Sequence, residues 1–456
     1  MEKIISEIAE KFIKKMIEIV ISGGKLGEVE TSLLCEAKAC ASKIVGVYAE
    51  AVDAAIVSDK VSRRKLGYSV ERLKDERRIQ SLVGEISYSR TYFKKASGGY
   101  EYLADAAIGV QSRSRVSESL SLALVQAAKD MSYAKSSNHI SNGEVSRQTV
   151  MHRIRQSCAV DASVEARQKV PELHIDADEA HVTLCGGKNT IVPLISIYEG
   201  IESKGSRREC KNIFHISEYG KHPDELWEQV LTEIERRYDI TNTKIYLHGD
   251  GARWIRVCYD WLPQAIFVLD KYHKNKAIKN MTVGLRKEVR KQFDLAIRQS
   301  LSENELELFK ELADVLGEEH PERKKKIQES SGYLYKFADG ISICEKDPCA
   351  NDGGCTEPHV SHILSSRLST RPMAWSKQTL KQLAPILAAG KSNLQMVRTE
   401  SPEVHKSLSK TVNHVNKTFR RNLQKWSLGA PHPDAVGTLP ISGKTTGTQV
   451  LLKLFK

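Results

Sequence analysis

The chain has 456 residues, of which 40% are hydrophobic and 28% are charged, so it can bury more than one core and is not a disordered chain. Lys and Arg outnumber Asp and Glu by 69 to 57, which gives a formal net charge of +12 and favours a polyanionic partner. The longest apolar run, at 191–198, is far shorter than the roughly 20 residues that cross a bilayer, which excludes a membrane-spanning helix and predicts no membrane partner.

The compartment follows from the N-terminus and the cysteines. The first 20 residues interleave Glu and Lys with apolar residues and lack the pattern of a secretory signal. The nine cysteines, an odd number, are scattered along a large chain, which favours reduced thiols over a disulfide framework. We therefore expect a cytoplasmic protein.

Residues 1–60 have the period of amphipathic helices. Apolar residues recur three, four and seven positions apart until a Gly-Gly pair, and the Ala-rich stretch 33–56 resumes the pattern. Residues 61–115 follow as a basic β-hairpin region, because residues 79–93 alternate larger with small polar side chains around Gly84. A helical segment followed by a hairpin is the expected start of the fold.

Residues 116–165 predict three helices. The first two are expected at 116–130 and 132–140, and the third follows a Ser-Asn-Gly turn and is capped by Ser146. This is the outline of a helix-turn-helix, whose last helix enters the major groove of DNA. Apolar side chains of that helix would face inward. The side chains that would point outward to base edges and phosphates are Arg147, Gln148, His152 and Arg155. A plain helical connector is the alternative.

Residues 166–280 predict a mixed five-stranded sheet. Three antiparallel strands followed by helix, strand, helix and strand is the order of an RNase H-like fold, so the fold class is α/β. The expected strands are 173–184, 190–198, 211–217, 244–250 and 265–270, with helices from Pro223 and over 252–262.

The stretch 281–340 is helical and strongly charged, with Ser302 as an expected helix cap, and it predicts an insertion in the catalytic domain. Residues 341–400 complete that domain with a further helix near Pro358. The last segment, 401–456, holds nine Lys or Arg against two acids, and such a tail commonly contacts phosphates.

Three carboxylates fall where this fold would bring them together. Asp178 interrupts the core-like first strand, Asp250 ends the fourth, and Glu357 starts the last helix. Each has an ordinary explanation on its own, as a strand-edge or helix-end residue. Oxygen ligands from separate rigid elements are what two Mg²⁺ ions need for phosphodiester chemistry, and the first and fourth strands are neighbours in this fold. The sequence thus predicts one catalytic site.

Longer motifs surround these acids: Ala177-Asp178-Glu179-Ala180-His181-Val182, His248-Gly249-Asp250-Gly251, Thr356-Glu357-Pro358-His359-Val360, Leu364-Ser365-Ser366-Arg367 and Arg371-Pro372-Met373-Ala374-Trp375-Ser376. With them, the whole chain resembles a DDE-type transposase of a bacterial insertion sequence. It is most similar to the Mutator-like group, in which a helical insertion separates the second Asp from the Glu.

The resemblance implies that Asp178, Asp250 and Glu357 are catalytic and hold two Mg²⁺ or Mn²⁺ ions. It implies cleavage of double-stranded DNA at element ends, strand transfer into target DNA, and a homo-oligomer associated with the bacterial nucleoid. Arg367 and Arg371 join the expected DNA contacts on the same basis.

Two positions depart from the family pattern. Related transposases often place a Cys and a His close together after the fifth strand, whereas this chain has Asp270 and His273 with Lys and Tyr between them. A role for His273 is therefore open. Asp176 competes with Asp178 for the first catalytic position, because side chains two apart on a strand share a face.

Three other interpretations stay open. Cys344, Cys349, Cys355 and His359 form a candidate zinc set, although their spacings lack the tight pairs of most zinc motifs. An RNase H-like nuclease without strand transfer would use the same carboxylates. A non-enzymatic DNA-binding protein would bind through residues 116–156 and the basic tail, without metal-dependent cleavage.

Overall fold

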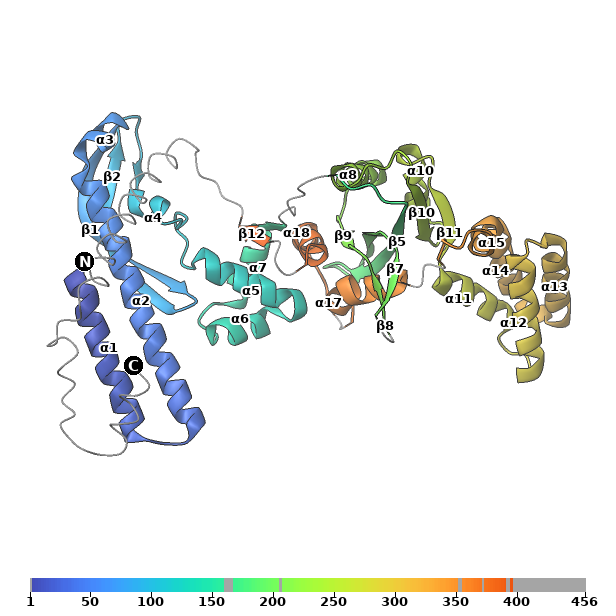
Figure 1. The fold of residues 1–456 in the computed structure, drawn as a ribbon, viewed down its shortest axis with the longest axis horizontal. Helices are drawn as coiled ribbons and strands as arrows, with labels where there is room; N and C mark the ends of the chain where they lie inside the picture. The colour runs from blue at the N-terminus through green and yellow to red at the C-terminus, as the bar shows by residue number, and fades with distance from the viewer. Residues whose placement is uncertain are drawn as a thin grey trace. The chain divides into compact units, whose positions relative to one another are not determined.

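The computed structural model describes residues 2–159, 167–204, 207–351, 355–370, 373–390 and 394–396. The described residues divide into two units, one up to Leu120 and one from Ser121 onward (Figure 1). The basic tail predicted at 401–456 lies outside the described residues. None of the described helices is both long and apolar enough to span a membrane.

The first unit joins a helical hairpin to a small sheet (Figure 1). As predicted, the first helix ends at a glycine pair, Gly23 and Gly24, whose φ angles are +70° and +135°. The second helix packs on the sheet so closely that a Cβ on Gly46 would lie 2.6 Å from the Ser87 carbonyl oxygen. The elements are α1 (Glu2–Ser22), α2 (Leu26–Ser58), α3 (Lys60–Lys65), β1 (Tyr68–Ser81), β2 (Gly84–Lys95), β3 (Tyr100–Glu101) and α4 (Leu103–Ala107).

Three short helices follow, with bounds close to those predicted: α5 (Glu118–Asp130), α6 (Tyr133–Ser141) and α7 (Arg147–Arg155). Ser132 and Ser146 cap the second and third helices by accepting hydrogen bonds from backbone N–H groups three residues on. Between these helices Asn142 and Gly143 take the positive φ angles that a tight turn needs. The pair Val150 and Ile154 is fully buried, as the helical period predicts.

The second unit is built on a mixed five-stranded sheet in the order β11-β10-β5-β6-β9. Its strands are β5 (Glu172–Thr183), β6 (Asn189–Tyr198), β9 (Phe214–Ile216), β10 (Lys244–Gly249) and β11 (Ile266–Leu269). The first three are antiparallel, and β10 and β11 run parallel to β5. This confirms the predicted mixed α/β sheet. The hairpin of β7 (Ile201–Lys204) and β8 (Arg207–Cys210), between the second and third of these strands, was not predicted.

The central strand β5 separates an apolar side of the sheet from a polar one. Leu173, Ile175 and Ala177 alternate onto one side, where they join a core with α8 (Pro223–Arg237), α9 (Arg253–Arg256) and α10 (Cys258–Trp261). The opposite side therefore carries His174, Asp176 and Asp178. The single helix expected over 252–262 is two short helices.

The helical insertion begins at Lys271, earlier than predicted, and forms its own core around Phe309, Leu316 and Leu334. It comprises α11 (Lys271–Thr282), α12 (Lys287–Ser302), α13 (Leu306–Glu319), the 3₁₀ turn Pro321–Arg323, α14 (Lys324–Lys336) and α15 (Ala338–Lys346). The cap prediction for Ser302 was wrong. Its hydroxyl bonds back to the Gln299 carbonyl at the end of α12, and α13 starts after Glu305.

The chain then returns to the polar side of the sheet. Near Pro358, as predicted, it enters α16 (Thr356–His359), which continues as a π-helix over Val360–Ser365 and as α17 (Ser366–Leu368). A last helix, α18 (Lys377–Ala388), follows, and β12 (Leu394–Met396) pairs with β4 (Ser157–Ala159).

The loop after β10 provides a test of the described fold. Gly251 has φ +76°, and a Cβ there would lie 2.2 Å from the Phe337 ring. We expect Gly251→Ala to lower the free energy of unfolding, by on the order of 2 kcal/mol or more, through backbone strain and this clash. Chemical denaturation measures the change.

Gly332→Ala is the matched control. Gly332 is exposed inside α14, and a Cβ there would meet nothing within 4 Å. Removal of a helix-interior glycine should stabilise the protein by up to about 1 kcal/mol. Equal stability changes in the two variants would contradict the described loop.

Candidate active site

Asp250 and Asp270 follow the carboxyl ends of the parallel strands β10 and β11, and Asp178 lies within the neighbouring strand β5. In the register of β10 with β5, His248 lies opposite Asp176, so Asp250 falls beside Asp178 two residues further on. In the register of β10 with β11, Gly249 lies opposite Leu269, so Asp250 also falls beside Asp270. Open sheets bind ligands at this edge.

The His248-Gly249-Asp250-Gly251 motif has a structural reason at each glycine. A Cβ on Gly249 would lie 2.9 Å from the Ala177 carbonyl oxygen, so only glycine lets β10 come this close to β5. Gly251 makes the sharp turn beneath the Phe337 ring. Between them, Asp250 accepts a 2.8 Å hydrogen bond from the Ala252 N–H. The close packing at Gly249 and Gly251 therefore fixes the loop that carries Asp250 before and after that residue.

The helical insertion also holds this loop. The Tyr333 hydroxyl donates a 2.9 Å hydrogen bond to the Asp250 carbonyl oxygen. Burial, followed by the negative charges of Asp250, Asp270 and Asp178, raises the pKa of Tyr333 above its ordinary value. The phenol thus lies beside all three aspartates and stays a hydrogen-bond donor at neutral pH.

Glu357 approaches the same place from α16. Its carboxylate is close enough to Asp178 that its charge contributes to the pKa shift of that residue. The structure therefore places both Asp250 and Glu357 near Asp178. The three carboxylates come from the first strand, the loop after the fourth strand and the helix after the insertion.

Asp178 is the carboxylate of this cluster with a strongly raised pKa. Its side chain is 9% exposed, and burial, followed by the charges of Asp270 and Glu357, raises its pKa to about 7. The Glu179 N–H bond and the nearby His273 act in the opposite direction. A carboxyl group in such a place favours either a proton or a bound cation.

Asp270 and His273 belong to the cluster, although the sequence left their role open. Asp270 is 2% exposed and caps α11 through the His273 N–H at 3.0 Å, while its other oxygen lies 2.7 Å from His273 Nδ1. Burial opposes a charge on the imidazole. The Asp270 bond and the charges of Asp178 and Asp250 outweigh it and raise the pKa of His273.

Asp176 faces the same side of the sheet but has different neighbours. Its carboxylate accepts a 3.1 Å hydrogen bond from the Tyr198 hydroxyl and lies 3.7 Å from His359 Nδ1. Asp178, one alternation nearer the strand end, is the residue beside Asp250 and Asp270. The structure thus favours Asp178 over Asp176 for the acidic cluster.

The donor set of this cluster suits Mg²⁺ or Mn²⁺. All of its acids offer hard carboxylate oxygens at a strand-end site, and the raised pKa of Asp178 shows that its buried charge is poorly balanced by the protein. As placed, no three His, Cys, Asp or Glu side chains among the described residues already surround a common metal position. Binding would draw the carboxylates inward.

Only some of the residues predicted to contact DNA are exposed in the structure. Arg147, Gln148 and His152 are exposed on α7. Arg155 instead donates 3.1 Å hydrogen bonds to Thr379 and Ser376 at the start of α18.

Arg367 is 7% exposed and is not placed to contact DNA. It donates a 2.8 Å hydrogen bond to the Ala128 carbonyl oxygen, and its guanidinium covers the rings of Tyr133 and Trp375. The sequence prediction missed this because a buried arginine and a surface arginine look alike in a motif. Arg371 lies outside the described residues.

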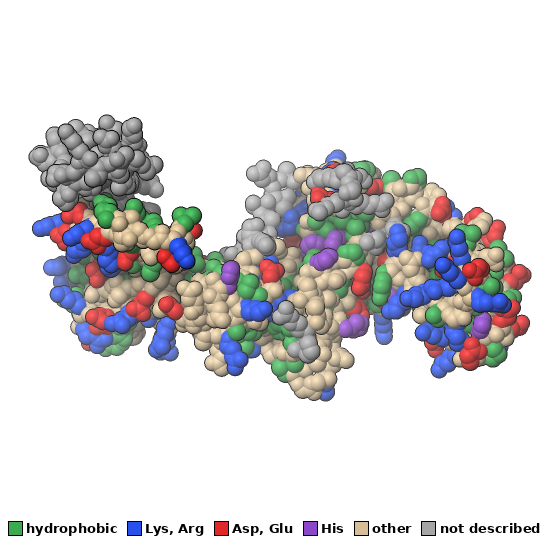
Figure 2. Space-filling view, turned by 90° about the horizontal axis from the view of Figure 1, so that it is seen from below, with side chains coloured by type: hydrophobic (Ala, Val, Ile, Leu, Met, Phe, Trp, Pro, Cys, Tyr) green, Lys and Arg blue, Asp and Glu red, His purple; other side chains and the backbone are tan. Residues whose placement is uncertain are grey.

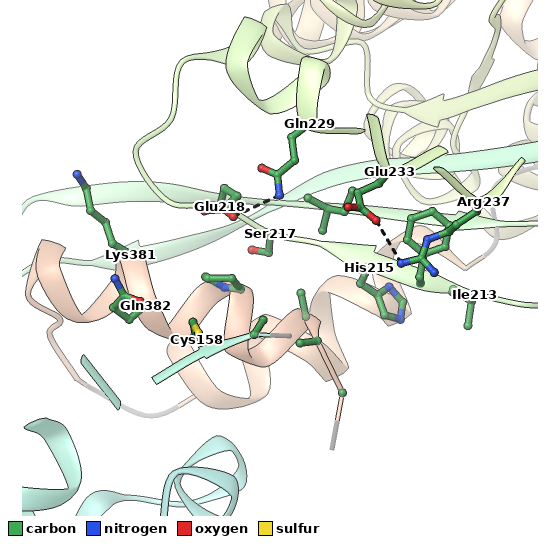
Figure 3. Close-up of a pocket in the computed structure, with 17 residues that line it drawn as sticks. Cys158, Ile213, His215, Ser217, Glu218, Gln229, Glu233, Arg237, Lys381 and Gln382 are labelled. Atoms are coloured by element: carbon green, nitrogen blue, oxygen red, sulfur yellow. Dashed lines mark hydrogen bonds and ion pairs between the residues drawn. The ribbon is translucent and has the colours of Figure 1, made fainter. Parts of the chain in front are cut away.

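A separate groove of about 520 Å³ lies along the edge strand β9 (Figure 3). It is lined by residues 213–218, by α8 side chains including Gln229, Glu233 and Arg237, and by Lys381 and Gln382 of α18. Arg237 pairs with Glu233 inside it. None of the acidic-cluster residues lines this groove.

The fold and site define an α/β protein with a carboxylate cluster at the ends of its parallel strands. Residues 21–403 match the model of the family described as "Uncharacterised protein family (UPF0236)". The chain belongs to this family.

Relatives cover most of the chain. "UPF0236 protein TTE0402" and "UPF0236 protein TTE0033/TTE0744/TTE0838/TTE0852/TTE1082/TTE1247/TTE1519/TTE1678/TTE1739/TTE1823/TTE2212" of Caldanaerobacter subterraneus subsp. tengcongensis are each 34% identical over 400 residues. The alignments span 86% of this chain and 80% and 84% of those proteins. "UPF0236 protein in vanSb 3'region" of Streptococcus gallolyticus is 22% identical over 447 residues, 94% of this chain and 96% of its own.

The raised pKa of Asp178 predicts a stability change with pH. The ordinary value of 3.8 applies to the unfolded chain and about 7 to the folded one, so the protonated carboxyl favours the fold below about pH 4 and this contribution is lost as the pH rises to 7. Asp178→Asn cannot ionise. Its stability advantage over the parent protein should therefore grow between pH 5 and 7, by on the order of 2 kcal/mol, and level off above.

Thermal unfolding in EDTA across this pH range measures the difference. Asp314→Asn, which changes an exposed acid of α13, is the control and should follow the parent protein at every pH. Parallel pH profiles for Asp178→Asn and the parent protein would rule out an unusually basic Asp178.

Proposed function

We propose that the protein is a metal-dependent DNA transposase with an RNase H-like catalytic domain, which cleaves the ends of an insertion sequence and joins them to target DNA. The observation that carries the proposal is the meeting of Asp178, Asp250 and Glu357 from three distant parts of the chain. Two Mg²⁺ or Mn²⁺ ions held there would activate the attacking oxygen and stabilise the leaving oxygen of the phosphodiester.

The protein's own groups then have separable tasks. Asp178, Asp250 and Glu357 supply ligand oxygens from rigid elements. Tyr333 fixes the Asp250 loop through its hydrogen bond to the carbonyl oxygen. Asp270 orients His273 through two hydrogen bonds, which places an imidazole of raised pKa beside the carboxylates and near the phosphate that they would receive.

The same elements offer basic surfaces to the DNA backbone. Helix α11 starts at the acidic cluster and carries four lysines and no acids, namely Lys271, Lys274, Lys276 and Lys279. Figure 2 shows Lys and Arg side chains gathered on the helical insertion that α11 begins. Such a surface would bind phosphates without reading sequence. Sequence reading is assigned to α7, the last helix of the proposed helix-turn-helix, through Arg147, Gln148 and His152.

The names of the relatives support a mobile element. One name joins eleven locus designations of a single organism. A protein encoded at many places in one genome is what repeated transposition of its gene produces. A transposase of this kind would work in the bacterial cytoplasm at the nucleoid, and as a homo-oligomer that brings two DNA ends together.

Two alternatives use parts of the same structure. A nuclease without strand transfer would cleave at the same cluster, and only joined DNA products separate it from a transposase. A non-enzymatic DNA-binding protein would have no reason to gather buried carboxylates at a strand edge. The electrostatic cost of Asp178 therefore favours an enzyme over that alternative.

Asp250→Asn and Glu357→Gln test the catalytic site. Each replaces a metal-binding oxygen by a neutral amide of similar shape, so cleavage of element-end DNA in Mg²⁺ should fall at least about 100-fold. DNA binding, measured by mobility shift at the same salt concentration, should stay within about twofold of the parent protein.

The controls carry the same chemical changes elsewhere. Asp314→Asn and Glu318→Gln alter exposed acids of α13 and should cleave as the parent protein does. If either site variant kept parental cleavage, the three carboxylates would not be the catalytic set.

Replacing Arg147 and Gln148 together by Ala tests the recognition helix. Removing a side chain that hydrogen-bonds a base edge costs about 1 to 3 kcal/mol, so specific affinity for the element ends should drop at least about tenfold, with a smaller decrease on unrelated DNA. Competition binding measures both affinities.

Arg167 and Gln168 form the matched control, because they are the same exposed dipeptide outside the helix. Their double Ala variant should keep the affinity ratio between specific and unrelated DNA. Unchanged discrimination in the Arg147 and Gln148 variant would end the assignment of α7.

A further inference from the structure

A second polar cluster lies on the same side of the sheet as the acidic cluster and has no task in the proposed chemistry. It gathers thiol, imidazole and carboxylate groups from four parts of the chain: Asp176 of β5, Cys210 of β8, His215 of β9, and Cys355 and His359, which precede and end α16. These are the ligand types that soft and borderline metal ions prefer.

The two thiols meet across the cluster. Cys210 and Cys355 are hydrogen-bonded to each other, and this bond together with burial and the nearby Asp176 raises the pKa of Cys210. The hairpin that carries Cys210 and the helix that carries Cys355 are therefore in contact through sulfur. Both cysteines are half-buried and neither forms a disulfide.

The two imidazole rings of the cluster are also in contact. The rings of His215 and His359 are 5.3 Å apart between centroids and nearly perpendicular. His359 follows Cys355 by one helical turn, with a 3.0 Å hydrogen bond from the His359 N–H to the Cys355 carbonyl oxygen. Both side chains of that pair therefore share one face of the helix.

The surrounding oxygens orient both rings. His215 Nδ1 lies 2.8 Å from the Ser196 hydroxyl. His359 Nδ1 faces Asp176 Oδ2 at 3.7 Å, and neither of these two buried atoms has a hydrogen-bond partner among the described residues. Asp176 is 2% exposed, so an unpaired oxygen there is costly. Metal-binding histidines commonly turn their second nitrogen to such an oxygen.

We propose that Cys210, His215, Cys355 and His359 bind a zinc ion, with Asp176 and Ser196 as the oxygens that orient the two histidines. The ligating atoms are both sulfurs and both Nε2 atoms, the Cys₂His₂ set of structural zinc sites. Each thiol loses its proton to solvent as a Zn–S bond forms, so the hydrogen bond between the thiols is replaced by two bonds to one ion.

The side chains are not yet arranged around one point, since no three potential ligands of the described residues surround a metal position. Zinc binding requires them to rotate inward, to about 2.3 Å for sulfur and about 2.0 Å for nitrogen. His215 also lines the groove beside β9 (Figure 3), which gives an ion a path from solvent.

The zinc set predicted from the sequence is only half of this one. Cys355 and His359 remain, but Cys344 contacts the Asn351 carbonyl oxygen, and Cys349 is exposed and lies beside Glu172. Cys210 and His215 replace them. They come from a hairpin and an edge strand far earlier in the chain, so no local spacing could have paired them with α16.

The position of Glu357 suggests a structural role for the zinc site. It lies midway between Cys355 and His359 on α16, so a zinc ion there would tie the helix that presents Glu357 to β8 and β9. This consequence rests on the proposed function, whereas the zinc site itself does not.

Metal analysis of the full-length protein, purified in reducing buffer without chelator, tests the site. We expect about one zinc per chain by mass spectrometry of the metal content. Cys210→Ser and Cys355→Ser should each lose most of it, and Cys349→Ser, an exposed cysteine outside the cluster, should keep it. Cobalt in place of zinc should give the sulfur-to-metal charge-transfer bands and the intense visible bands of a tetrahedral thiolate site.

His359→Cys protects the test against variants that fail to fold. It exchanges one ligand for another, so zinc should remain and the cobalt charge-transfer band should strengthen. Absence of zinc from the parent protein, together with absence of cobalt bands after reconstitution, overturns the site. So does a Cys210–Cys355 disulfide that persists in reducing buffer.

The two proposals fail separately. Zinc bound at full occupancy in a protein that never cleaves DNA would refute the transposase and leave the zinc site standing. Cleavage that depends on Asp250 and Glu357 in a zinc-free protein would do the opposite.

Discussion

The repulsion among buried carboxylates at one edge of the sheet is the constraint on which the rest of the structure depends. Asp178 and Asp270 are both nearly inaccessible to water, and the register of β10 places Asp250 beside each of them. Negative charges this close in a low dielectric destabilise one another and the fold. Burial is the largest cause of the raised pKa of Asp178, about 7, and the charges of Asp270 and Glu357 add to it.

Several otherwise unrelated features make sense as ways to hold this arrangement. Gly249 lets β10 approach β5, and Gly251 accepts a Phe337 ring where any side chain would collide. Tyr333 reaches from the insertion to the Asp250 loop. Asp270 and His273 form an ion pair at the start of α11. Proteins keep strain of this kind where a ligand relieves it.

The alternation of β5 explains why two polar clusters share one side of the sheet. Leu173, Ile175 and Ala177 face the apolar core, and Asp176 and Asp178 therefore lie on the opposite side, where α16 contacts β5. Glu357 reaches the acidic cluster, while its neighbours Cys355 and His359 reach the Cys/His cluster around Asp176. A movement of α16 would thus shift residues of both clusters.

Sequence reasoning succeeded where a local pattern has one physical cause. The strand pattern of 173–184 and the cap at Ser146 predicted strand and helix positions close to those observed. It failed at a serine that bonds within its own helix and at an arginine whose burial is set by tertiary packing. Ser302 has the composition of a cap but bonds backward, and Arg367 is buried against aromatic rings.

The candidate site shows the same division. The three carboxylates were predictable because Asp178 interrupts an apolar strand, Asp250 follows a strand and Glu357 starts a helix. The membership of Asp270 depends on strand register, which alternation alone does not supply. Cys210 and His215 depend on the unpredicted hairpin of β7 and β8 that leads into β9. Separation along the chain hides such groups until the sheet order is known.

Anomalous diffraction from crystals of the protein soaked in Mn²⁺ is the most direct measurement of the central claim. The account predicts Mn²⁺ peaks within bonding distance of carboxylate oxygens of Asp178, Asp250 and Glu357, at the place where β10 ends beside β5. Peaks only elsewhere, or carboxylates that stay apart in saturating Mn²⁺, would contradict it.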